Sequence, residues 1–167
     1  MATLENEITT LFLDYSCRRL ETMTGSLGVC LSRLTDAQIW ERHGEHENAV
    51  GNLVLHLCGN MRQWVIAGVG GAVDVRDRDA EFSTDGGIDA GELIGRFAET
   101  VAEAREVIVS LPEERLTERI NPQHGEVSVL EAIYHVVGHV QQHVGQIILV
   151  TKQMIEQDLD LTMPRPR

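Results

Sequence analysis

Apolar residues recur every three or four positions along most of the chain, which is the spacing of one face of an α-helix. The first such pattern runs from Thr3 to about Leu34 and predicts a long helix. Gly25 and Gly28 weaken the middle of this helix, so a bend is allowed there. Its apolar face comprises Leu4, Ile8, Leu11, Phe12, Tyr15, Leu20, Met23, Leu27 and Leu31.

Three further helices are predicted, from about Ala49 to Ala67, from Asp89 to Leu111 and from about Val129 to Gln157. Pro112 marks the end of the third helix. No segment shows the strict alternation that is typical of a strand. Capping pairs open a short turn and the last two helices, at Thr35 with Gln38, Asp89 with Glu92, and Ser128 with Glu131.

Four helices of this length, with a long Gly- and Asp-rich connection between the second and the third, predict an all-α fold, a four-helix bundle. A chain of 167 residues with 43% apolar content suits a single domain over residues 1–167. Aromatic residues make up only 4% of the chain, so Leu, Val, Ile and Ala must fill most of the core.

The charge argues against several classes of partner. The chain has 14 Lys and Arg against 26 Asp and Glu, a formal net charge of −12. Nucleic-acid binding and anionic membrane surfaces both call for a basic patch, which this dispersed pattern lacks. Three cysteines do not make a disulfide framework, and the acidic N-terminus lacks a signal-peptide pattern. We therefore expect a cytoplasmic protein that binds neither nucleic acid nor membrane.

Three histidines on the fourth helix, His135, His139 and His143, are spaced four residues apart. On a helical wheel, His139 and His143 border the apolar arc and can look into the bundle, whereas His135 lies towards the polar side. An i, i+4 pair of histidines can hold one transition metal, with a third ligand from another helix. His56, between Leu55 and Leu57 on the second helix, is the candidate for that third ligand.

The residues alone leave a structural alternative open. A lone histidine on an apolar face is more often a hydrogen-bonded core residue than a ligand. The remaining histidines lie in polar, loop-like contexts and are weaker candidates, namely His43, His46 and His124. The cysteines are interpreted as small buried hydrophobes, namely Cys17, Cys30 and Cys58.

The segments "NLVLHLCGNMRQW" and "HVVGHVQQHVGQI", together with "RDRDAEFS", resemble the DinB/YfiT-like superfamily of metalloenzymes, in a bacterial branch of unknown function. The resemblance covers nearly the whole chain and implies an up-down-down-up bundle. It implies that His56, His139 and His143 hold a metal and that His135 does not. Superfamily members include S-transferases that use low-molecular-weight thiols, hydrolases and isomerases.

Three neutral imidazoles would leave a metal with an open fourth position for a thiol or a water molecule. We therefore expect a divalent metal, zinc or nickel first and iron or manganese otherwise, and a small-molecule substrate. The leading hypothesis is a thiol S-transferase. The alternatives are a metal-dependent hydrolase, a bundle that binds metal or a small ligand without catalysis, and a structural bundle without metal.

Polar residues near the three histidines are candidates for hydrogen-bonding the ligands or lining a pocket. Arg62 could receive an anionic substrate group or form a surface ion pair, and Glu131 could act as a base beyond its capping role. The segment from Arg76 to Phe82 is either a solvated loop with local ion pairs or a cover over the pocket or a dimer contact. Gly138 and Gly145 on the outer face of the fourth helix favour a homodimer. The candidates for hydrogen-bonding the histidine ligands or lining a pocket are Asn52, Asn60, Arg62, Gln63 and Gln146.

Overall fold

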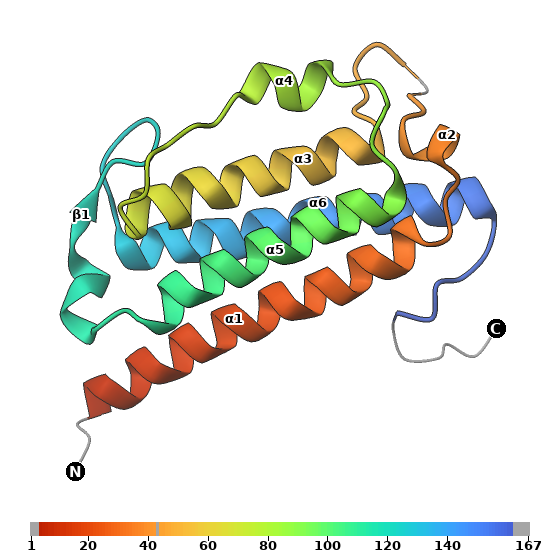
Figure 1. The fold of residues 1–167 in the computed structure, drawn as a ribbon. Helices are drawn as coiled ribbons and strands as arrows, with labels where there is room; N and C mark the ends of the chain where they lie inside the picture. Colours follow the sequence, from red (N-terminus) through yellow and green to blue (C-terminus); the bar gives the residue numbers. More distant parts are fainter. Residues whose placement is uncertain (1–3, 43, 162–167) are drawn as a thin grey trace.

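Helices dominate the computed structural model, which describes residues 4–42 and 44–161 (Figure 1). Four of them are long and lie side by side, and they run up, down, down and up in chain order. The predicted all-α bundle and its direction are therefore confirmed. The four helices are α1 (Leu4–Leu31), α3 (Val50–Met61), α5 (Ala90–Val109) and α6 (Val129–Ile155).

The predicted capping pairs set the starts of three helices. Asp89 Oδ1 accepts a hydrogen bond from the backbone N–H of Glu92 at 2.8 Å, at the start of α5. Ser128 and Glu131 cap α6 reciprocally, and Thr35 does the same with Gln38 at the short helix α2 (Asp36–Ile39). Each cap satisfies backbone donors that the first helical turn would otherwise leave without partners.

The core lies between two helix pairs. Helix α1 packs against α5 and α6, and α3 packs against the same two helices. Phe97 is the largest fully buried side chain, and most of the others are aliphatic, as the low aromatic content predicts. Helix α1 runs through Gly25 and Gly28 as one element.

The second predicted helix does not stay α-helical to its end. The α-helical part stops at Met61 and continues as a π-helix, η1 (Arg62–Val69), in which Gly70 N–H donates to Val65 O, five residues earlier. Gly68 approaches Pro122 and Gly70 approaches Val107 so closely that neither glycine has room for a Cβ. These close approaches allow the wider turn to pack, which the apolar spacing alone could not reveal.

The connection between α3 and α5 contains a helix of its own. Helix α4 (Arg78–Ser83) packs along α3 (Figure 1). Asp77 caps it, because its Oδ1 accepts a hydrogen bond from Ala80 N at 3.0 Å. This segment is too short for a helical pattern to be recognised in the sequence. We refer to residues 71–89 as the crossover.

Two-residue strands correct the expectation that the chain has none. Strand β1 (Arg119–Ile120) pairs antiparallel with β2 (Val127–Ser128), after a 3₁₀-helix, η2 (Glu113–Thr117). Two residues cannot display an alternating pattern. The hairpin between them holds Gly125 at a φ of 104°, where a side chain would be strained.

The outer face of α6 is open at both glycines, since among the described residues no heavy atom beyond the helix's own adjoining backbone lies within 4 Å of a Cβ placed at Gly138 or Gly145. The homodimer nevertheless stays a prediction. Across residues 4–42 and 44–161, no helix is both long enough and apolar enough to cross a membrane.

Candidate metal centre

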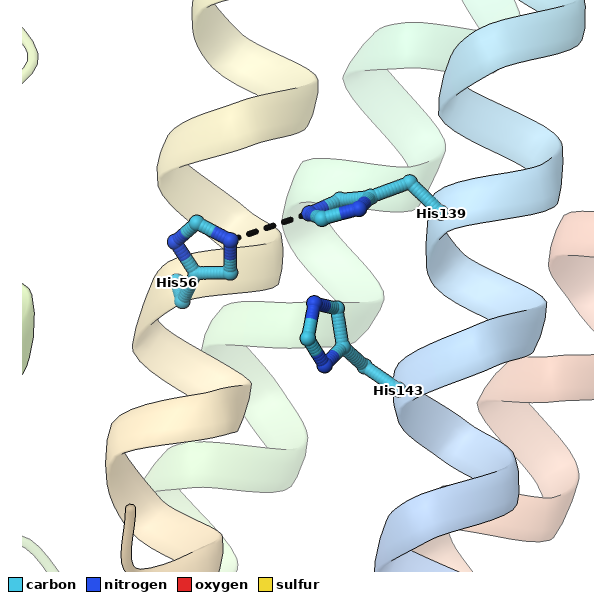
Figure 2. Close-up of side chains that lie close together, drawn as sticks. All are labelled: His56, His139 and His143. Atoms are coloured by element: carbon cyan, nitrogen blue, oxygen red, sulfur yellow. Dashed lines mark hydrogen bonds between the residues drawn. The ribbon is translucent and has the colours of Figure 1, made fainter. Parts of the chain in front are cut away.

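Three histidines meet between α3 and α6. Helix α3 contributes His56, and α6 contributes His139 and His143, one turn apart (Figure 2). One ring nitrogen from each lies within 4.8 Å of the others. Nε2 of His56 and Nε2 of His139 lie 2.9 Å apart. The structure thus brings together the three residues that the sequence singled out.

The local sequence explains this placement. On α6, Val136, Val140 and Val144 are fully buried and hold the helix against the bundle. His139 and His143 follow this apolar row at its edge, so both rings project towards α3 and remain only partly exposed. His56 itself is buried at 8% exposure on the facing helix.

The spacing of the nitrogens fits one tetrahedral ion. Metal–nitrogen bonds of about 2.0–2.1 Å at tetrahedral angles separate ligand nitrogens by roughly 3.3 Å. The His56–His139 distance of 2.9 Å is slightly shorter, and the 4.8 Å limit of the cluster is longer. Small side-chain adjustments would bring all three nitrogens to metal-binding distance.

The imidazoles on α6 are neutral at physiological pH, as metal ligands must be. Burial, with smaller contributions from the neighbouring His143 and His56, lowers the pKa of His139 to about 4. Burial also lowers the pKa of His143, although a hydrogen bond to Gln146 opposes the shift. Each of these two rings therefore carries a single N–H near pH 7 and keeps one nitrogen with a lone pair.

Hydrogen bonds orient two of the rings. His143 Nδ1 lies 2.6 Å from Gln146 Oε1, and an amide oxygen only accepts, so Nδ1 carries the proton. His56 Nδ1 lies 3.0 Å from Glu81 Oε2. In both rings the proton on Nδ1 leaves the lone pair of Nε2 for the centre. His139 Nε2 then donates to His56 Nε2 across the 2.9 Å contact.

Glu81 is the functional neighbour that sequence reasoning missed. It lies on α4, and its side chain is only 8% exposed. Arg76, 4% exposed, donates to both carboxylate oxygens, from Nε to Oε1 at 2.7 Å and from Nη2 to Oε2 at 2.9 Å. Burial raises the pKa of Glu81, but hydrogen bonds from Arg76 and His56 outweigh it and hold that pKa below its usual value.

The interpretation of the Arg76–Phe82 segment as a solvated loop is therefore wrong for Arg76 and Glu81. The segment covers the His56 side of the cluster instead, and the Phe82 ring lies 4.9 Å from the imidazole of His56. Alternating charges in the sequence look solvated because no helical spacing marks which of them is buried.

The expected neighbours of the histidines have different places. Gln146 contacts His143 directly. Gln63 lies one layer further out, where its Oε1 accepts from Arg76 Nη1 at 2.9 Å. Arg62 forms a two-pronged ion pair with Glu103 on α5, at 2.9 Å for each hydrogen bond, so its surface ion-pair alternative is the one observed.

The two asparagines do not orient a histidine ring. Asn52 is fully buried and binds the crossover, through hydrogen bonds from Nδ2 to the carbonyls of Glu81 and Thr84. Asn60 is buried, and its Oδ1 accepts no hydrogen bond within the described part of the chain. Positions one turn from His56 share its side of the helix but do not reach its ring nitrogens.

Comparison with known proteins identifies the family of this chain. Residues 7–167 match the family described as "Protein of unknown function (DUF1572)". The chain belongs to this family. A search of curated proteins gives no match.

Solved structures show the same fold at low sequence identity. A conserved protein from Enterococcus faecalis matches with a TM-score of 0.67 and 16% identity, over 93% of this chain and 100% of its own. A DinB-like protein from Bacillus subtilis matches at 0.66 and 12%, over 92% and 99%. A DinB-like protein from Bacillus cereus matches at 0.65 and 15%, over 88% and 92%. The DinB-like resemblance of this DUF1572 chain is confirmed.

The other histidines in the described part of the DUF1572 chain lie outside the cluster. His135 is exposed, as predicted, and its ring lies between those of Trp64 and His139, at 4.2 Å and 5.6 Å between centroids. His46 and His124 are not among the clustered residues, and His43 lies outside the described residues. His135 is therefore a neighbour of the site.

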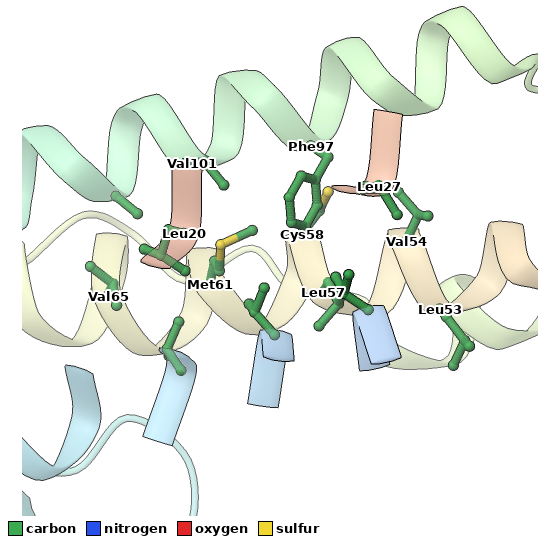
Figure 3. Close-up of a cluster of buried hydrophobic side chains, with 14 of the residues drawn as sticks. Leu20, Leu27, Leu53, Val54, Leu57, Cys58, Met61, Val65, Phe97 and Val101 are labelled. Carbon is green, nitrogen blue, oxygen red and sulfur yellow. The ribbon is translucent and has the colours of Figure 1, made fainter. Parts of the chain in front are cut away.

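No fourth protein ligand joins the three histidines among the described residues. Cys58 lies on the other side of α3, beside Phe97 (Figure 3). Burial raises the pKa of its thiol to about 11, so it is an inert core side chain. Glu131 caps α6 and pairs with Arg119 at 3.2 Å, which leaves it no role at the cluster.

Proposed function

We propose that this protein is a metal-dependent enzyme in which His56, His139 and His143 hold one divalent metal and leave one side of it open to a small molecule. The observation that carries this proposal is the donor set: three converging imidazoles and, in the described part of the chain, no fourth ligand. Structural zinc sites usually close all four positions with protein ligands, whereas catalytic sites keep one open.

The donor set also bears on the metal. Imidazole nitrogens suit zinc, nickel, iron and manganese, and we expect zinc or nickel. When bound, such a metal supplies Lewis acidity, which lowers the pKa of a thiol or a water molecule at the open position. The side chains of the protein hold the metal, orient its ligands and exclude water on one side.

We further propose that the substrate is a low-molecular-weight thiol in an S-transfer reaction. A surface hollow of about 420 Å³, lined by Tyr134, His135, Gly138, His139 and Gln142, gives a small molecule access to His139. The rings of Phe82 and His135 flank the cluster on two sides. Sulfur packs well against the edges of aromatic rings, so these rings favour a thiol.

The proposed reaction balances without an external oxidant. The sulfur of the thiol forms a bond to an electrophilic carbon of the second substrate. The leaving group departs with the electron pair of the bond that breaks, and the thiol proton goes to solvent. The chain excludes water on the His56 side through the crossover.

Metal content tests the centre first. We expect untagged wild-type protein to carry about one metal per chain and His139→Ala to carry none, because two imidazoles rarely retain an ion. His135→Ala is the matched control, since it removes a histidine from the same helix without touching the predicted ligand set, and it should keep the metal. Elemental analysis after reconstitution gives the result, and wild-type protein without stoichiometric metal would overturn the proposal.

The reaction class is tested on the metal-loaded protein. Loss of free thiol in the presence of a model electrophile supports S-transfer. Ester or amide hydrolysis without thiol loss would assign the site to a hydrolase. Stoichiometric metal without turnover of either kind would make the protein a metal-binding bundle and contradict the enzyme proposal.

A further inference from the structure

His56 differs from the other two histidines in what holds its second nitrogen. Its Nδ1 lies 3.0 Å from Glu81 Oε2, and both side chains are nearly buried, at 10% and 8% exposure. The carboxylate comes from α4, a segment outside the two helices that carry the histidines. The crossover thereby contributes a carboxylate that contacts one of the three clustered histidines directly.

Arg76 fixes the plane of this carboxylate. It binds Oε1 through Nε and Oε2 through Nη2, so both oxygens are engaged by one planar fork. Its remaining nitrogen, Nη1, donates to Gln63 Oε1 at 2.9 Å. A guanidinium held at three points cannot rotate freely, and the carboxylate between it and His56 is held equally firmly.

Gly59 provides the place where the carboxylate lies. A Cβ at this position would overlap Oε1 of Glu81 and crowd Arg76 Nε. Gly59 is three residues after His56 on the same face of α3. The missing side chain therefore lets the Glu81 carboxylate lie against the helix backbone beside the imidazole.

The backbone is anchored at Glu81 and in the residues that follow it. Asn52 donates to the carbonyl of Glu81 at 3.0 Å and to that of Thr84 at 2.7 Å. Arg42 donates to the carbonyl of Phe82 at 2.9 Å. These three carbonyls lie at the C-terminal end of α4, so that end is held in a defined place over α3.

The protonation of the contact follows from its partners. A carboxylate that accepts from a guanidinium is an acceptor only, so the hydrogen bond to His56 needs a proton on Nδ1. Arg76 Nη2 also lies 3.1 Å from Nδ1, but both atoms then carry protons, so this is a contact and the bond belongs to Glu81. Nε2 of His56 keeps its lone pair directed at His139.

We propose that Glu81 is a positioning residue of the metal centre, which fixes the orientation and the Nδ1–H tautomer of His56, and that Arg76 holds Glu81 for this purpose. The inference rests on the proposed three-histidine centre. Partners of this kind raise metal affinity because the ligand is already in the right tautomer before the ion arrives.

Zn²⁺ affinity measures the effect on the centre. We expect Glu81→Gln to weaken Zn²⁺ binding by about 10- to 100-fold in a competition titration with a chelator. Asp79→Asn is the matched control, because it removes an exposed carboxylate from the same short helix, and its affinity should equal that of the wild type. Equal affinity of Glu81→Gln and wild type would overturn the proposal.

The tautomer of His56 provides a readout that needs no metal. In metal-free wild-type protein, ¹⁵N-edited NMR should show the proton of His56 on Nδ1, and Glu81→Gln should shift the population towards Nε2–H. Gly59→Ala should have the same effect with Glu81 still present, because it takes away the place of the carboxylate. A wild-type His56 protonated on Nε2 would overturn the proposal without any variant.

The two readouts separate the two proposals. If wild-type protein binds no Zn²⁺ but His56 shows the Glu81-dependent tautomer, the metal centre fails and the positioning role stands as a structural one. If Zn²⁺ binds through the three histidines while the tautomer is independent of Glu81, the centre stands and the positioning role fails.

Discussion

The two sides of helix α3 differ in composition and in role. One side is apolar and packs into the core, where Cys58 lies beside Phe97 and Met61 belongs to the same buried cluster (Figure 3). The other side carries Asn52, His56 and Gly59 under the crossover. His56 and Cys58 are two residues apart, which places them roughly 200° apart around the helix. One helix thus separates what stabilises the fold from what forms the site.

Burying the charged groups on the polar side of α3 costs free energy unless each group is paired. A buried ion pair such as Arg76–Glu81 is stable only when each charge keeps its hydrogen bonds, and removing one partner leaves the other buried and unpaired. The apolar side needs no such arrangement. The comparison therefore implies that the stability of the bundle and the integrity of the site can be changed separately.

The largest expected effect on stability comes from the apolar side. Met61 is fully buried, and Met61→Ala should lower the free energy of unfolding by about 2–5 kcal/mol through lost burial and the cavity left behind. Metal content per folded chain should not change. Denaturant unfolding and elemental analysis measure the two quantities, and Met61→Leu, which conserves volume, is the control. A parallel loss of metal would break the separation.

An intermediate effect is expected where the crossover is anchored. Asn52→Ala should cost about 1–3 kcal/mol, because the side chain is buried and its partners include the carbonyls of Glu81 and Thr84. It should also expose the crossover to protease, with cleavage inside residues 71–89. Limited proteolysis followed by mass spectrometry locates the cut. Cleavage at wild-type rate would mean that Asn52 does not hold this segment.

The smallest effect is expected at the exposed edge of the π-helix. Arg62 and Glu103 form an ion pair in which both side chains are almost half exposed, at 44% and 45%. Arg62→Ala should therefore change the free energy of unfolding by about 0–1 kcal/mol. Thermal unfolding of the variant, compared with Glu103→Gln, provides the measurement. A larger loss would show that this charge belongs with the buried network.

Much of the fold and part of the site could be predicted from the sequence. Helical spacing and capping pairs indicated the bundle, because each long helix buries one continuous apolar face. The same spacing placed His139 and His143 together. Glu81 could not be found this way, since the crossover has no periodicity and its partner His56 is 25 residues away. The π-helix was missed because its glycines pack against Pro122 and Val107, which are distant in sequence.

Gly59 has a consequence for the evolution of the family. Any side chain there would collide with the carboxylate of Glu81. The glycine and the acid should therefore be inherited as a pair, together with the arginine that holds the acid. Among homologous chains, we expect a larger residue at the position of Gly59 to coincide with the loss of the glutamate, and such chains to orient the equivalent of His56 by other means.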